Sequence, residues 1–115
     1  MKFSESLKSN EQFKNVYKLG KSYGNKYLVM YVSENHLPIN RLGISVSKKV
    51  GNSVVRHGLT RLIRESYRLN EDMFSSGLDI VVIARNAAAG IRFAQVQSAL
   101  LHLSGLHKII KDTNA

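Results

Sequence analysis

The sequence predicts an α+β fold, a single-domain α/β sandwich in which helices pack on one sheet in the element order αββαβα. Three observations lead to this prediction. Apolar residues recur at helical spacing over residues 53–69 and 93–111. They alternate with small or polar residues over 41–47 and form a continuous run within 79–84, as in strands buried on one and on both faces. The 115 residues contain no repeat or linker, and we therefore expect one domain over residues 1–115.

The first helix is expected to begin after Ser9 and to end at Gly20. Ser9 and Gln12 stand three residues apart, as do the two members of a capping box, whose side chains satisfy the backbone N–H groups of the first turn. Gly20 stands where a glycine commonly ends a helix. Phe13 and Tyr17 are four residues apart and therefore share one face of this helix.

Two strands should follow this helix. Residues 26–33 are mostly β-branched, aromatic or apolar, and residues 34–40, which contain the only proline, read as a turn. Because this turn connects them directly to the alternating residues 41–47, we expect the two strands to pair as an antiparallel hairpin. Residues 79–84 should form a central strand, and residues 86–90 a loop.

A longer helix is predicted from Ser53, its expected N-cap, to about residue 70, and a last one over residues 93–111 that Gly105 could end early. At 100° per residue, the first of these two helices divides into an apolar arc and a basic arc. The apolar arc, expected in the core, holds Val55, Leu59, Leu62, Ile63, Ser66 and Leu69. The basic arc holds Arg56, His57, Thr60, Arg61, Arg64 and Arg68.

The charge of the chain is strongly positive and locally concentrated. Seventeen Lys and Arg residues stand against eight Asp and Glu residues, for a net charge of +9. Seven of the basic residues and one acid lie between positions 41 and 68. Such a concentration indicates a surface for a polyanion, nucleic acid first and an anionic membrane second. The longest apolar runs are far shorter than the ~20 residues that span a bilayer, and no secretory signal opens the chain, so we expect a cytoplasmic protein.

The basic arc resembles a nucleic-acid surface more than a solvated helix face. Solvated faces usually mix charges of both signs, whereas Glu65 stands only at the margin of this arc. Arginine can bind phosphate in bidentate fashion and stack on bases. Lys48 and Lys49 precede the helix start, where backbone N–H groups also favour phosphate. Phe13 and Tyr17 either fill the core or border a groove in which unpaired bases stack.

The residues do not predict a self-sufficient enzyme. The absence of cysteine excludes thiol chemistry and cysteine-bound metals. The four histidines have no metal-ligand spacing, no Ser/His/Asp set or P-loop is visible, and the acids are scattered. We therefore predict no catalytic residue and no metal site in the protein itself. A protein-only nuclease would need clustered carboxylates, and a reader of double-stranded DNA would show a helix-turn-helix pattern.

Two segments of the chain resemble a known protein family. Arg41-Leu-Gly-Ile-Ser-Val-Ser-Lys-Lys-Val-Gly-Asn-Ser-Val-Val-Arg56, followed by Arg61-Leu-Ile-Arg-Glu65, is similar to the protein subunit of bacterial ribonuclease P. The likeness begins at the Asn10-Glu-Gln-Phe13 helix and extends through Ile80-Val-Val-Ile-Ala-Arg85 into the last helix, so that it covers nearly the whole chain. The Ser-Val-Ser-Lys-Lys-Val-Gly-Asn run with an arginine-rich helix is far more specific than basic composition.

The resemblance implies a left-handed βαβ crossover, against the usual right-handed rule. It also implies a ribonucleoprotein in which the RNA subunit, working with magnesium that it mainly holds itself, removes the 5′ leader of precursor tRNA. The protein would bind both the RNA subunit and the precursor tRNA, with no obligate protein partner. By matching position, Lys48, Lys49, Asn52, Arg56, His57, Arg61, Arg64 and Arg68 would face the RNA subunit. Phe13, Tyr17, Val29, Tyr31 and Arg85 would line a cleft for the single-stranded leader.

One segment departs from the family pattern. Where the family's helix usually reads Arg-Asn-Arg, an apolar residue and then Lys-Arg, this chain reads Arg56-His57-Gly58-Leu59-Thr60-Arg61. Two cationic positions are thereby lost, which predicts weaker RNA binding and a shallower salt dependence, by about 0.7–0.9 in slope per phosphate contact. The alternative function that the residues leave open is a ribosomal-type protein or general RNA chaperone, which would bind RNA without promoting leader removal.

Overall fold

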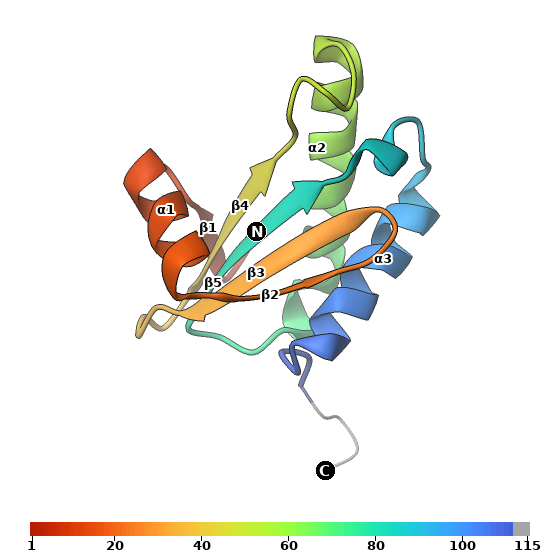
Figure 1. Cartoon of the computed structure of the whole chain (residues 1–115). Coiled ribbons are helices and arrows are strands. Elements are labelled where there is room, and N and C mark those ends of the chain that lie inside the picture. Colours follow the sequence, from red (N-terminus) through yellow and green to blue (C-terminus); the bar gives the residue numbers. More distant parts are fainter. Residues whose placement is uncertain (112–115) are drawn as a thin grey trace.

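The structure, a computed structural model, describes residues 1–111 as one sheet with helices on both faces. In Figure 1, α1 lies on one face of the sheet, and α2 and α3 lie together on the other. The elements in chain order are β1 (Ser4–Ser6), α1 (Asn10–Leu19), β2 (Lys21–Gly24), β3 (Leu28–Glu34), β4 (Asn40–Ser45), α2 (Ser53–Asn70), β5 (Leu78–Ala84) and α3 (Phe93–Leu106), with short 3₁₀ turns at Glu71–Met73 and Asn86–Ala88. The α+β sandwich is confirmed, with two strands, β1 and β2, added to the predicted order.

The strand order is β1-β4-β5-β3-β2, and the predicted hairpin between β3 and β4 is wrong. β5 lies between these strands, antiparallel to β3 and parallel to β4. The hairpin of the sheet is instead formed by β2 and β3. β5 is the most apolar strand and is almost entirely buried, so the central position removes the largest apolar surface from water. β2, with only Tyr23 half-buried, carries too weak a pattern to have been predicted.

The crossover from β4 through α2 to β5 is left-handed, as the resemblance implies. In Figure 1 the chain rises along β4, descends through α2 behind the sheet and rises again along β5, to the right of β4. The turn after β4 and the first residues of α2 extend beyond one end of the sheet. The basic residues of that segment therefore project from the body of the molecule.

Two clusters of buried apolar side chains hold the layers together. The larger fills the space between the sheet and α2 and α3, and the smaller joins Leu7, Val16 and Val81 beneath α1. Tyr67 is fully buried in the larger cluster, while Leu69, predicted in the core, is 56% exposed. The core side of α2 is thus rotated toward Tyr67 relative to the predicted arc, because the large ring fills the space beside Phe74 at a centroid distance of 4.9 Å.

Local hydrogen bonds decide where the helices begin and end. The capping box of Ser9 and Gln12 is present, which confirms the predicted start of α1. Asn52, rather than Ser53, caps α2, because its side-chain oxygen accepts a hydrogen bond of 3.0 Å from the backbone N–H of Val55. α3 ends at Leu106 instead of Lys111, consistent with an early end near Gly105.

Candidate nucleic-acid interface

The turn after β4 and the exposed side of α2 form one cationic surface. Lys48 and Lys49 are exposed in the turn, and His57, Arg61 and Arg64 are exposed along the helix. None of these five side chains forms an ion pair with any residue from 1 to 111. The surface therefore carries uncompensated positive charge next to the N-terminus of an 18-residue helix, an arrangement that attracts phosphate.

Asn52 and Arg56 join this surface but also have local structural roles. The Asn52 side chain is already used as the helix cap, so what it offers a ligand is its amide nitrogen. Arg56 is half-buried, and its Nε atom is buried without a hydrogen-bond partner among the described residues. A buried donor without a partner costs free energy, and a phosphate oxygen is a suitable acceptor for a guanidinium.

Arg68 differs from the other arginines of the helix. Its Nε donates a hydrogen bond of 2.9 Å to Glu65, and its Nη2 donates a second one to the other carboxylate oxygen. The arginine hydrogen bonds lower the pKa of the Glu65 carboxyl, which therefore stays ionised near neutral pH. Glu65, expected only at the margin of the basic arc, thus pairs with Arg68 and partly neutralises the C-terminal end of the arc.

A second surface lies on the α1 side of the sheet, where three aromatic rings meet. Tyr17 from α1 packs edge-on against Tyr31 from β3 at 5.0 Å between ring centroids, and Phe13 follows at 6.4 Å from Tyr17. A groove of about 380 Å³ runs beside Phe13 and Tyr17 and reaches Ser45 at the end of β4. Both readings of the aromatic pair therefore hold in part: Phe13 packs on the sheet, and Tyr17, 38% exposed, borders a groove.

Gly43 allows this packing of α1. A Cβ atom at this position would come within 2.6 Å of the Phe13 ring and 2.9 Å of Leu7, so any larger residue would push the helix away from the sheet. Burial raises the pKa of the Tyr17 phenol, and the Ser45 hydroxyl partly offsets that rise. The phenol stays neutral near pH 7 and can donate a hydrogen bond.

Val29 and Arg85 lie farther along the same face of the sheet. Val29 is two residues from Tyr31 and pairs in register with Ile83 and with Gly24. Arg85, which follows β5, is exposed and donates a hydrogen bond of 3.1 Å to the backbone carbonyl of Asn25. The five residues expected to line a cleft therefore share one face, from the aromatic cluster under α1 to the β2–β3 turn.

Sequence reasoning missed several residues of this second surface. Ser45, Ile83 and Gly24 point to the same face as Tyr31, because their register partners do. The alternating pattern over residues 41–47 could have identified Ser45, because it places the small residues on the sheet face opposite to that of the apolar ones. Gly24 carried no usable signal, because β2 was not predicted.

Within residues 1–111, no three His, Asp or Glu side chains come together as metal ligands, and no helix is long and apolar enough to cross a membrane. The histidines of the C-terminal region serve the fold instead. His102 Nδ1 lies 3.2 Å from the Asn25 amide, and His107 Nε2 lies 2.8 Å from the Met30 carbonyl oxygen.

Comparison with known proteins agrees with the geometry. A family model described as Ribonuclease P matches residues 1–108. The ribonuclease P protein component of Lachnoclostridium phytofermentans is 66% identical over 110 residues, which cover 96% of this chain and 95% of that protein. Among solved structures, the Staphylococcus aureus RNase P protein matches with a TM-score of 0.85 and 37% identity, covering 92% of this chain and 97% of that one.

The Thermotoga maritima RNase P protein has a TM-score of 0.79 and 35% identity, with 85% of this chain and 93% of that one covered. The family match, the close relative and the two solved structures thus span almost the whole described chain and share its fold. The chain belongs to the bacterial ribonuclease P protein family, the protein subunits of the ribonucleoprotein holoenzyme that matures the 5′ end of tRNA.

Proposed function

We propose that this chain divides its two RNA ligands between its two surfaces. The turn after β4 and α2 bind the ribonuclease P RNA, and the groove on the α1 face binds the single-stranded 5′ leader of precursor tRNA. The observation that carries this proposal is the separation of the two surfaces. One is cationic and non-aromatic and projects beyond the sheet, while the other is aromatic and lies on the sheet itself.

Each surface suits its proposed ligand. A folded RNA presents a phosphate backbone, which Arg61, Arg64 and the two lysines of the turn can contact without reading its sequence. A leader has unpaired bases, and aromatic side chains such as Tyr17 and Tyr31 give those bases faces to stack on. Arg85, exposed at the far end of that face, can bind a leader phosphate.

Magnesium belongs to the RNA subunit in this proposal. Among residues 1–111 no three His, Asp or Glu side chains come together, which supports placing the magnesium on the RNA. The cationic surface instead neutralises RNA phosphates and thereby lowers the magnesium concentration that the RNA needs to fold and to hold its substrate. We expect the protein to act in the cytoplasm.

The test is cleavage of a precursor tRNA with a 5′ leader at low magnesium, with a bacterial ribonuclease P RNA and with or without this protein. We expect cleavage at the mature 5′ end to depend on the protein at low magnesium and to disappear without the RNA. RNA binding with no stimulation of cleavage would instead favour the general RNA-binding function. Substrates with and without a leader then report on the groove separately.

A further inference from the structure

An apolar hollow next to the cationic surface lies between α2 and the turn that precedes α3. Its volume is about 510 Å³, within the range of about 300–1,000 Å³ of small-molecule sites. One wall is the first half of α2, and the other is the segment from Ala88 to Ile91. Val54, at the mouth, is 78% exposed, an unusual state for a branched apolar side chain.

Gly58 keeps this hollow open. Val54, Gly58 and Leu62 stand four residues apart and therefore form one row along the helix surface, with the glycine as a gap between two apolar side chains. A Cβ atom built on Gly58 meets nothing within 4 Å, so no packing in the protein requires a glycine there. A side chain longer than a methyl group would instead reach into the hollow, so the small residue leaves the space between the two walls free.

The polar groups at the edge of the hollow are a cation and an acceptor. Arg61 borders both the hollow and the cationic surface, and it forms no ion pair with residues 1–111. Glu65 lies one helical turn farther on, and a hydrogen bond from Arg68 holds its carboxylate in place. Each carboxylate oxygen keeps lone-pair capacity for a further donor. The site therefore combines apolar walls, a phosphate-binding guanidinium and an anionic hydrogen-bond acceptor.

We propose that this hollow receives one unpaired base of the ribonuclease P RNA, an adenine, guanine or cytosine whose amino group donates to Glu65 and whose phosphate contacts Arg61. An unstacked base has flat apolar faces and a hydrogen-bonding edge, which match the walls and the carboxylate. The positive charge of Arg61 and the continuity of the hollow with the cationic α2 surface favour RNA over a peptide as the occupant. The inference rests on the proposed binding of the RNA subunit to α2.

The matched variants are Gly58→Leu and Gly58→Ala. Both keep the net charge and both raise helix propensity, but only leucine extends a side chain into the hollow. We expect Gly58→Leu to bind the ribonuclease P RNA about tenfold more weakly at unchanged salt slope, the loss of roughly one stacked base. Gly58→Ala should bind like the unchanged protein. Thermal unfolding of both variants checks that the fold is kept.

A second readout identifies the base. Chemical modification of the Watson–Crick edges should show one unpaired adenine, guanine or cytosine protected by the unchanged protein and by Gly58→Ala, and reactive with Gly58→Leu. Changing that base to uracil should weaken binding of the unchanged protein and add nothing to the loss in Gly58→Leu. Equal affinity and equal protection with both variants would overturn the inference. Failure of Arg64→Ala to weaken RNA binding would instead contradict the proposed role of α2.

Discussion

Whether an arginine of this protein stabilises the fold or is free to bind a ligand depends on its burial. Arg41 and Asp79 form a nearly buried pair on neighbouring strands, with hydrogen bonds of 2.7 Å from Nε to Oδ1 and from Nη2 to Oδ2. Asn35 adds a third hydrogen bond, of 2.9 Å, to Asp79. The hydrogen bond to Asp79 raises the pKa of the Arg41 guanidinium. Arg41 therefore belongs to the fold, although it is one of the seven basic residues of the charged segment 41–68.

Replacing Asp79 with alanine should destabilise the protein by about 3 kcal/mol, because it leaves the Arg41 charge half-buried without its partner. Equilibrium unfolding in urea measures this loss. Glu65→Ala, which breaks the exposed pair with Arg68, is the matched control and should change stability far less. Equal losses in the two variants would mean that burial does not set the strength of these pairs.

Tyr17→Ala should weaken binding of a precursor tRNA with a leader to the holoenzyme by about tenfold, because a base loses its stacking partner. Binding of mature tRNA, which has no leader, should stay the same. Tyr17→Phe keeps the ring against Tyr31 and should retain most of the affinity. A loss of equal size for mature tRNA would show that the substitution disturbs α1 rather than a leader contact.

Single elements are held by contacts far apart in the sequence, and β1 is the clearest case. Its three residues pair in parallel with β4, and Glu71, just after α2, accepts hydrogen bonds from the backbone N–H groups of Lys2 at 2.7 Å and Phe3 at 3.1 Å. Ser4 and Tyr67 add a hydroxyl–hydroxyl contact of 2.6 Å. A short edge strand is thereby fastened to the end of α2.

This attachment should weaken in acid. Burial by itself raises the pKa of Glu71, but hydrogen bonds from Ser4 and the two backbone groups outweigh it, so the pKa is lowered on folding. The stabilisation is therefore present above the ordinary value of 4.5 and is lost as pH falls through the lower value of the folded state. Unfolding free energies of the protein and Glu71→Gln should differ at pH 7 and converge in acid. A difference independent of pH would exclude this role of the charge.

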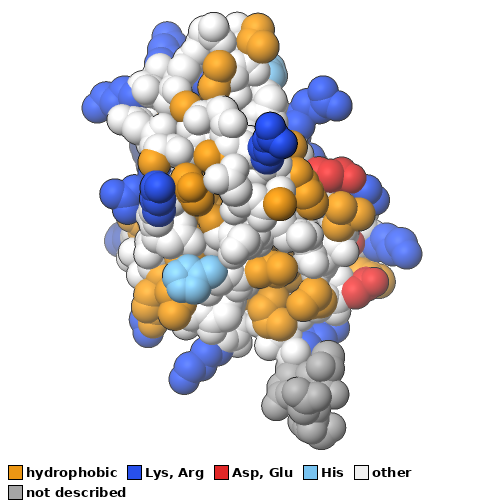
Figure 2. Space-filling model, turned by 90° about the vertical axis from the view of Figure 1, so that its right-hand side faces the viewer, with side chains coloured by type: hydrophobic (Ala, Val, Ile, Leu, Met, Phe, Trp, Pro, Cys, Tyr) orange, Lys and Arg blue, Asp and Glu red, His pale blue; other side chains and the backbone are white. Residues whose placement is uncertain are grey.

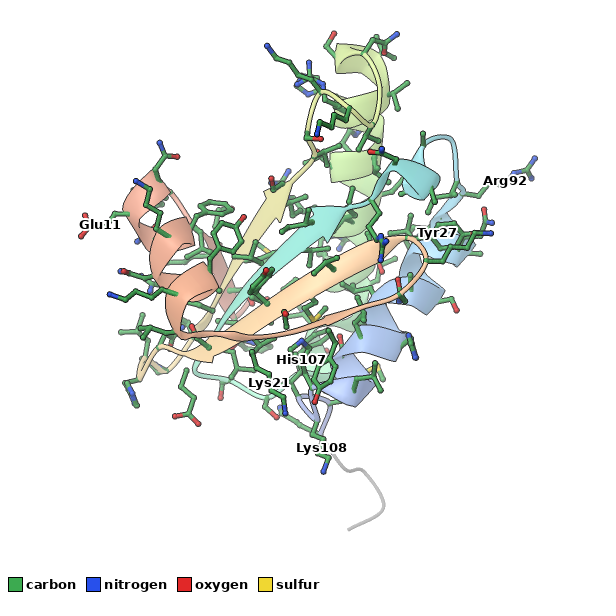
Figure 3. All side chains as sticks on the ribbon, in the orientation of Figure 1. Glu11, Lys21, Tyr27, Arg92, His107 and Lys108 are labelled. Carbon is green, nitrogen blue, oxygen red and sulfur yellow. The ribbon has the colours of Figure 1, made fainter. Side chains whose placement is uncertain are left out.

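The molecule as a whole presents its basic side chains widely. Figure 2 shows Lys and Arg side chains at many points along the outline of one face, with few acidic ones between them. In Figure 3, Arg92 extends into solvent beyond the turn that precedes α3, while Lys21 and Lys108 lie near His107 at the opposite end. The net charge of +9 therefore favours the approach of RNA, and we expect the α2 surface to be where the RNA docks.

The salt dependence of RNA binding should separate docking residues from the rest. Arg64→Ala removes an uncompensated cation from α2 and should reduce the slope of log affinity against log salt by about 0.7–0.9. Arg68→Ala removes the same charge type, but its partner Glu65 already neutralises it, so the slope should change less. Titrations at several salt concentrations measure both. Equal changes would mean that the Arg68–Glu65 pair opens when RNA binds.

Patterns over neighbouring residues were sufficient to predict the α+β class, the capping box of α1, the buried strand β5 and the basic side of α2. Each of these features depends on residues two to four positions apart. At such short separations the geometry of a helix or strand determines the direction in which each side chain points. The quoted motifs were sufficient for the family. They also named most residues of the two surfaces, although binding at those surfaces stays a prediction.

The tertiary structure alone decided the strand order and the hollow beside Gly58. β5 separates β3 from β4 because the most apolar strand gains most from the centre, a competition among strands that no local pattern contains. The hollow exists only because the turn after β5 lies opposite Gly58. Local spacing thus determined the elements and their chemistry, and burial across the whole chain determined which of them meet.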